Sequence, residues 1–136
     1  MAAAGAAASA TNFQSFSAFA ATLNCGGVSG PVVVDVVAGS GPYNQQVSFN
    51  SILGGSAINT VTINGNNNTL SFPSGTDYYT LRLNGADYMT WNNLNIVSTG
   101  TANGIALSMM NGSDFNTFNN CEFSVPTTIT ATTTSC

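Results

Sequence analysis

A motif repeated in the second half of the chain constrains the fold more than any other feature of the sequence. Residues 83–96 and residues 110–123 lie 27 positions apart and are identical at six of fourteen positions. The shared positions include an Asn-Gly turn, an Asp, a Thr and an Asn-Asn pair, and most of the others exchange like for like. A fainter copy surrounds residues 59–64, and the apolar run 32–37 falls one step earlier. Residues 31–136 therefore hold about four copies of one unit.

Each unit is built from short segments in which apolar and polar residues alternate, and Gly, Asn, Pro and Ser clusters separate the segments. The predicted strands are Val32–Val37, Gln46–Phe49, Thr60–Asn64, Thr80–Leu83 and Tyr88–Trp91. A repeat of 27 or 28 residues made of short strands is typical of one coil of a β-solenoid. Successive coils then pair as parallel strands about 4.8 Å apart. The sequence therefore predicts an all-β fold, a parallel β-helix of about four coils.

Equivalent residues of stacked coils lie directly above one another, so the repeat predicts three columns. The inward apolar column is Ile63, Trp91 and Phe118. The column at the bend is Asn64, Asn92 and Asn119, whose amides are expected to hydrogen-bond along the axis at an inside corner. The outward column is Thr62, Thr90 and Thr117. A chance match in an Asn- and Thr-rich chain is the alternative, but the turn, aromatic and strand positions all agree.

One amphipathic helix is predicted over residues 12–24, because Phe13, Phe16, Phe19 and Leu23 recur at steps of three and four. Thr11 or Asn12 is expected to cap its start, and the Gly26-Gly27 pair follows its end. The helix is expected to cover the first coil. The predicted organisation is a small-residue tail (1–11), a capping helix (12–24), the coils (25–125) and a Thr-rich tail or strand (126–136).

The charge content excludes several classes of function. Five acidic residues, one Arg or Lys and no His give a net charge of -4, and only 4% of residues are charged. Nucleic-acid binding needs clustered Lys and Arg, so it is not expected. No apolar run approaches the length of roughly 18 residues that a membrane span requires. Few charges together with many Asn and Thr favour an extracellular protein.

The chain also resembles a known group of proteins. The matching residues follow the helix end at Leu23-Asn24 and are segments 25–32, 36–47, 54–63, 83–88 and 93–96. Over about residues 12–125 the sequence is similar to right-handed parallel β-helix, pectin-lyase-like segments of secreted cell-surface proteins from Bacteroidetes-type bacteria. The resemblance implies a right-handed coil and a cell-surface location. It implies no particular reaction.

Two acidic residues repeat in register and are the best candidates for chemistry. Asp87 and Asp114, stacked on the order of 5 Å apart, have the spacing of a retaining glycosidase pair or of two Ca²⁺ ligands. The favoured interpretation is that each caps its Asn-Gly turn, since the preceding coil carries the neutral Asn59 there. For lyase chemistry, the nearest set of Arg82, Asp77 and Asp87 is too sparse. No catalytic residue, metal site or cofactor is therefore predicted.

Three cysteines, Cys25, Cys121 and Cys136, match no metal-binding spacing. Cys121 aligns with Leu94, so it is expected to be a buried free thiol. Cys25 and Cys136 belong to opposite ends of one solenoid, and a disulfide between subunits is one option for them.

A solenoid has two open edges whose backbone groups lack partners, and few charges here oppose association. The first hypothesis is therefore a non-catalytic, extracellular structural protein, a β-helix subunit that self-associates into a surface filament or adhesive layer. The alternative is a polysaccharide-binding module or a vestigial polysaccharide lyase or glycosidase-like β-helix. Surface glycans would then be partners, with Tyr78, Tyr79 and Tyr88 as the aromatic candidates.

Overall fold

The computed structural model describes residues 12–73 and 77–127, which form a parallel β-solenoid of about three turns with one short helix. The helix is α1 (Phe16–Gly26). The strands are β1 (Val32–Asp35), β2 (Tyr43–Asn44), β3 (Val47–Asn50), β4 (Val61–Phe72), β5 (Tyr79–Asn84), β6 (Met89–Ser98), β7 (Ile105–Met110), β8 (Thr117–Asn119) and β9 (Glu122–Ser124). The predicted tail 1–11 and residues 128–136 of the predicted C-terminal segment lie outside the described residues.

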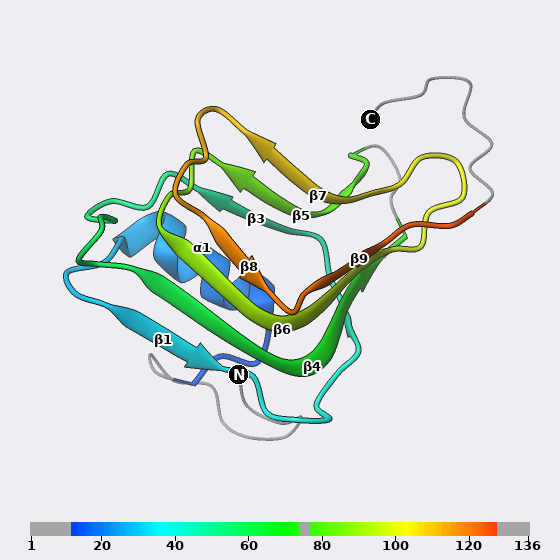
Figure 1. Ribbon diagram of the computed structural model, residues 1–136, viewed down its shortest axis with the longest axis horizontal. Helices are drawn as coiled ribbons and strands as arrows, with labels where there is room; N and C mark the ends of the chain where they lie inside the picture. The colour runs from blue at the N-terminus through cyan, green and yellow to red at the C-terminus, as the bar shows by residue number, and fades with distance from the viewer. Residues whose placement is uncertain (1–11, 74–76, 128–136) are drawn as a thin grey trace.

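Each turn of the solenoid has three sides, as Figure 1 shows. The first side stacks β1, β4, β6 and β8 in that order, and the second uses β2, the later parts of β4 and β6, and β9. The third side is a separate sheet of β3, β5 and β7. Every pairing among these strands is parallel, so the prediction of a parallel β-helix is confirmed.

The number of turns is smaller than predicted, about three in place of about four. The last copy of the motif supplies only β8 and β9, which are three residues each, and within the described residues no strand of the third side follows them. The register of the repeat is as predicted: Ile63 pairs with Trp91, and Trp91 pairs with Phe118.

The corner between the first and second sides is made by asparagine. Asn93 and Asn120, the second members of the two Asn-Asn pairs, have φ of 52° and 50°. Asparagine visits this left-handed region more readily than most other residues do, so each pair ends one strand segment and redirects the chain. In β4 the corner is longer, and its register with β6 shifts between Asn64 and Asn68.

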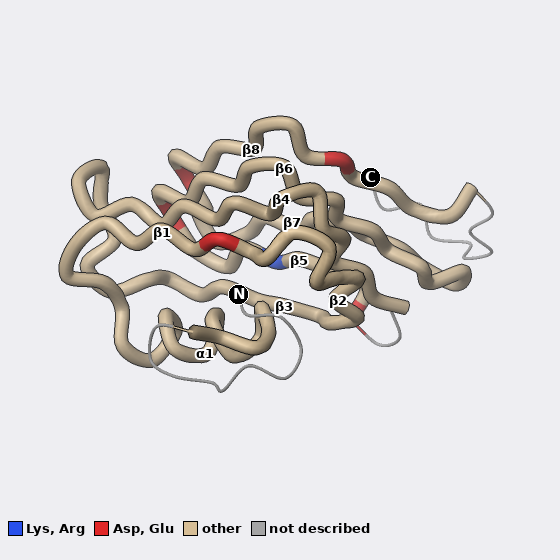
Figure 2. The backbone as a smooth tube through the Cα atoms, turned by 90° about the horizontal axis from the view of Figure 1, so that it is seen from below, with Lys and Arg blue, Asp and Glu red and all other residues tan. Residues whose placement is uncertain are grey.

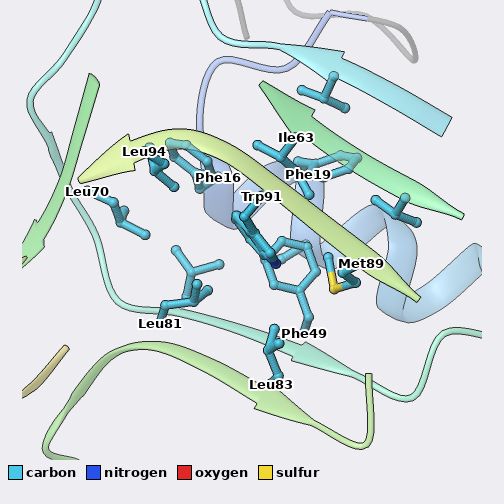
Figure 3. Close-up of a cluster of buried hydrophobic side chains, with 14 of the residues drawn as sticks. Phe16, Phe19, Phe49, Ile63, Leu70, Leu81, Leu83, Met89, Trp91 and Leu94 are labelled. Carbon is cyan, nitrogen blue, oxygen red and sulfur yellow. The ribbon is translucent and has the colours of Figure 1, made fainter. Parts of the chain in front are cut away.

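The core fills the tube between the three sides. Inward side chains of successive turns touch one another, and Trp91 is at its centre with no exposed surface (Figure 3). The Trp91 ring lies edge to face with Phe49, at 5.4 Å between centroids, and nearly parallel to Phe118, at 6.1 Å. Side chains from the first, second and third sides therefore share one apolar interior.

The helix begins later than predicted. Ser15, and not Thr11 or Asn12, is the N-cap, because its Oγ accepts a hydrogen bond from the Ala18 amide at 3.0 Å. Phe13 precedes the helix but still packs against Phe19, with ring centroids 5.3 Å apart. The apolar spacing therefore extends to residues that precede the helix, which is why this spacing predicts an earlier start for the helix.

α1 covers the first turn of the solenoid, at the end opposite β8 (Figure 2). Phe16 and Phe19 are buried against Tyr43 and Phe49, respectively. The side chain of Asn24 donates to Ser48 O at 3.0 Å and accepts from Asn50 N at 2.8 Å. This amide takes the place of a neighbouring strand along the edge of β3.

Candidate functional site

The opposite end of the solenoid is uncovered within the described residues, and we call residues 105–125 the terminal coil. Its strands β7, β8 and β9 each pair on one side only among the described strands. Ile96 is fully buried, whereas its register partner Phe123, one turn later, is 43% exposed. Leu83 is likewise fully buried, whereas its register partner Met109, one turn later, is 46% exposed. Inward positions of the core are therefore open to solvent here.

Large exposed apolar side chains concentrate on the terminal coil. They are Met109, Met110, Phe115, Phe123 and Val125, half of the ten such residues in the described chain. The terminal coil carries only two charged residues, Asp114 and Glu122. Its composition is thus closer to an interface than to a solvated surface.

An amide ladder runs along the first corner and has a defined direction. Asn119 Nδ2 donates to Asn92 Oδ1, Asn92 Nδ2 to Asn64 Oδ1, and Asn64 Nδ2 to Asp35 Oδ1, at 2.9, 2.9 and 2.7 Å. An ionised carboxylate only accepts hydrogen bonds, so Asp35 fixes the orientation of every amide above it. The ladder starts from an acidic residue that aligns with the asparagines. It lies on the outer side of the corner, where Asn64 and Asn92 are half-buried and Asn119 is exposed.

The direction of this ladder leaves an acceptor at the open end, since no other described residue donates to Asn119 Oδ1. A second ladder joins Asn111 to Asn84 and Asn84 to Asn50, at 2.5 and 3.1 Å. The second ladder was not predicted, because its two steps are unequal: Asn111 to Asn84 spans 27 residues, and Asn84 to Asn50 spans 34. The Asn84 and Asn111 identity within the repeat was the signal available.

Asn68 is a further structural residue that the repeat did not reveal. It pairs in register with the apolar Leu94 and is only 4% exposed. Its amide donates to Val37 O at 2.9 Å and to Gly65 O at 2.8 Å, and it accepts from Gly41 N at 2.8 Å. One buried side chain therefore satisfies three backbone groups at the longer corner of β4.

Aromatic side chains also stack along the axis. The rings of Tyr88 and Phe115 lie 4.8 Å apart and 6° from parallel, and Phe115 is 72% exposed. Tyr79 is buried beneath the guanidinium of Arg82, at 3.6 Å from its ring centroid. Tyr79 begins β5 and Tyr88 follows its end, so the aromatic candidates for sugar stacking do not gather in one place.

The acidic candidates take structural positions. Asp87 Oδ1 accepts a hydrogen bond from the backbone N–H of Asp114 at 2.6 Å, which joins the turns of two coils. Arg82 stacks on Tyr79, away from Asp87 beyond the other end of β5. Within residues 12–73 and 77–127, no three His, Cys, Asp or Glu side chains come together as metal ligands. Asp87 therefore links two consecutive coils, and this contact differs from the predicted capping of its own Asn-Gly turn.

The cysteines are distributed between the two ends. Cys25 is an exposed free thiol in the last turn of α1, at the covered end. Cys121 is a free thiol in the terminal coil, with Sγ 3.5 Å from Trp91 O, and it is half-buried where full burial was expected. No coil covers it among the described residues, which explains the difference. Cys136 lies outside the described residues, so its pairing with Cys25 stays a prediction.

None of the described helices has the length and apolar character needed to cross a membrane. A scan against protein-family models, a search of curated proteins and a search of solved structures each gave no match.

Proposed function

We propose that this chain is a non-catalytic, extracellular structural protein, a β-helix subunit that self-associates into a surface filament or adhesive layer. We also propose that it is a segment of the pectin-lyase-like type found in Bacteroidetes-type cell-surface proteins. The observation that supports association is the terminal coil, where inward core positions such as Phe123 and Met109 are exposed.

Association through the terminal coil has three physical contributions. Covering one large apolar side chain contributes about 1.5–3 kcal/mol. Unpaired strand edges gain backbone hydrogen bonds when another strand adds to them. The low charge of the terminal coil, with only Asp114 and Glu122, means that little electrostatic repulsion opposes contact between copies.

The other end of the solenoid does not offer an equivalent surface. α1 buries Phe16, Phe19 and Leu23 over the first turn. Stacking copies head to tail would require α1 to detach from the first turn, and the side chains that it buries would then be exposed. The proposed contact therefore uses terminal coils, and a filament or layer needs a second contact on another face.

Replacing Phe123 by aspartate tests this role. Phe123→Asp places a charge on the uncovered core face, so we expect the dissociation constant for self-association to rise at least about tenfold. Sedimentation equilibrium over a concentration series measures this change. Ile58→Asp is the matched control, because Ile58 is 80% exposed and lies outside the terminal coil. Equal effects of the two substitutions, or a wild-type protein that is monomeric at every concentration, would contradict the proposal.

A polysaccharide-binding role is the second candidate, and the exposed ring of Phe115 is the observation that favours it. Sugars pack against aromatic faces, and one face of this ring is occupied by Tyr88. Its other face belongs to the surface that association would cover. Saturable binding of a polysaccharide that is lost in Phe115→Ala would support this candidate. The absence of saturable binding by the wild type would exclude it, and binding unchanged by the substitution would exclude Phe115 as the site.

A further inference from the structure

We propose that the occupant of the terminal coil is a second copy of this chain, related by a two-fold axis that lies beside Phe118, at the open edge of β8. This inference rests on the proposed self-association and specifies its geometry. It predicts a closed dimer in which the two terminal coils face each other and both α1 helices lie at the outer ends.

The backbone of β8 presents hydrogen-bonding groups to the open edge at Phe118. Val61 N donates to Tyr88 O at 3.1 Å, so the carbonyl group of Tyr88 points toward β4. Along a strand, the backbone groups of successive residues point alternately toward the two neighbouring strands. The N–H and C=O of Trp91, three residues later, therefore point toward β8. In a parallel pair, a residue whose N–H and C=O point toward the neighbouring strand bonds to the residues before and after its register partner on that strand. Phe118 is that partner, so its own N–H and C=O point away from β6.

A two-fold axis at Phe118 makes the two β8 strands antiparallel. Phe118 then lies opposite Phe118 of the second copy, and each N–H meets the other copy's C=O. The axis points toward the interior of the tube, so both Phe118 side chains stay inside. The apolar column of Ile63, Trp91 and Phe118 thereby continues into the second copy.

The same axis supplies the donor that the amide ladder lacks. With Phe118 opposite its own copy, Thr117 lies opposite Asn119 of the second copy, and both side chains are on the outer face. The Thr117 hydroxyl is a hydrogen-bond donor, and Asn119 Oδ1 is the acceptor whose orientation Asp35 fixes. Symmetry forms this contact twice. Stacking two identical corners would instead bring two acceptors together.

The remaining sides also become paired. Rotation about an axis through the first side exchanges the second and third sides, so β9 lies over β7 of the second copy and runs antiparallel to it. The inward side chains of these strands, Phe123 and Met109, are both partly exposed in one copy and cover each other in the dimer. A single symmetry operation therefore accounts for the uncovered core and the open strand edges.

Cross-linking distinguishes this arrangement from other modes of association. The variants Thr117→Cys and Asn119→Cys are made separately in a background that carries Cys25→Ser, Cys121→Ser and Cys136→Ser. Facing residues of a pair that is not hydrogen-bonded have Cα atoms about 4.5 Å apart, within the range of a disulfide. The two variants are oxidised alone and as an equimolar mixture, and covalent dimers are measured by non-reducing electrophoresis.

We expect covalent dimers in the mixture and essentially none in either variant alone, because each cysteine faces the other position. Covalent dimers in a single variant, or none in a mixture that sedimentation shows to be dimeric, would overturn the two-fold geometry and leave self-association standing. If the triple-serine background and the wild type are both monomeric at every concentration, the proposed function fails together with this inference.

Discussion

Replacing Trp91 by alanine is expected to lower the free energy of unfolding by about 3–5 kcal/mol, the range for large aromatic residues in well-packed cores. Trp91 has no exposed surface and touches aromatic rings from two other turns, Phe49 and Phe118. Its removal opens a cavity at the centre of the tube that β-strands on three sides cannot easily close. Urea unfolding followed by circular dichroism measures the loss.

The control for this substitution is Leu53→Ala, because Leu53 is 80% exposed on a turn between β3 and β4. We expect the control to change the free energy of unfolding by less than about 0.5 kcal/mol. A loss below about 1 kcal/mol for Trp91→Ala would show that this side chain is not part of a continuous column between the coils.

The second large effect is expected for Asn68→Asp, a change of one atom in a buried side chain. The Asn68 amide nitrogen donates to Val37 O and Gly65 O, and a carboxylate cannot donate to either. The substitution places an uncompensated negative charge against two carbonyl oxygens at a position only 4% exposed. We expect a loss of about 3–5 kcal/mol at neutral pH, as for other buried charges left without a partner.

The neighbouring residue provides a matched control. Asn67→Asp makes the same chemical change at an exposed position with φ of 57°, which aspartate also tolerates. Unfolding of both variants under the same conditions separates the buried hydrogen bonds from the added charge. Equal losses in the two variants would show that the contacts of Asn68 do not support the corner.

The repeat predicted the stacking of the coils because a parallel solenoid places residues one period apart in direct contact. A single offset of 27 was enough to pair Trp91 with Phe118 and Asn92 with Asn119. The apolar spacing likewise predicted the helix and the side chains that it buries, Phe16, Phe19 and Leu23. These features depend on the regular spacing of similar residues, which a single sequence displays directly.

The structural features that the sequence did not predict lie where the repeat is irregular. The corner of β4 is longer than the others, so Asn68 occupies an apolar register position and its buried role is visible only in the structure. Asp35 begins the amide ladder as the one member that is not an asparagine. The sequence predicted an open edge, but which side chains remain uncovered there depends on where the turns end in space.

Hydrogen exchange at low and high protein concentration tests most directly that the terminal coil is the surface through which copies associate. We expect the amides of residues 105–125 to exchange more slowly as the concentration rises, while those of α1 and β3 do not change, because α1 already covers the first turn. Slower exchange in α1 and β3 with no change in the terminal coil would contradict this claim.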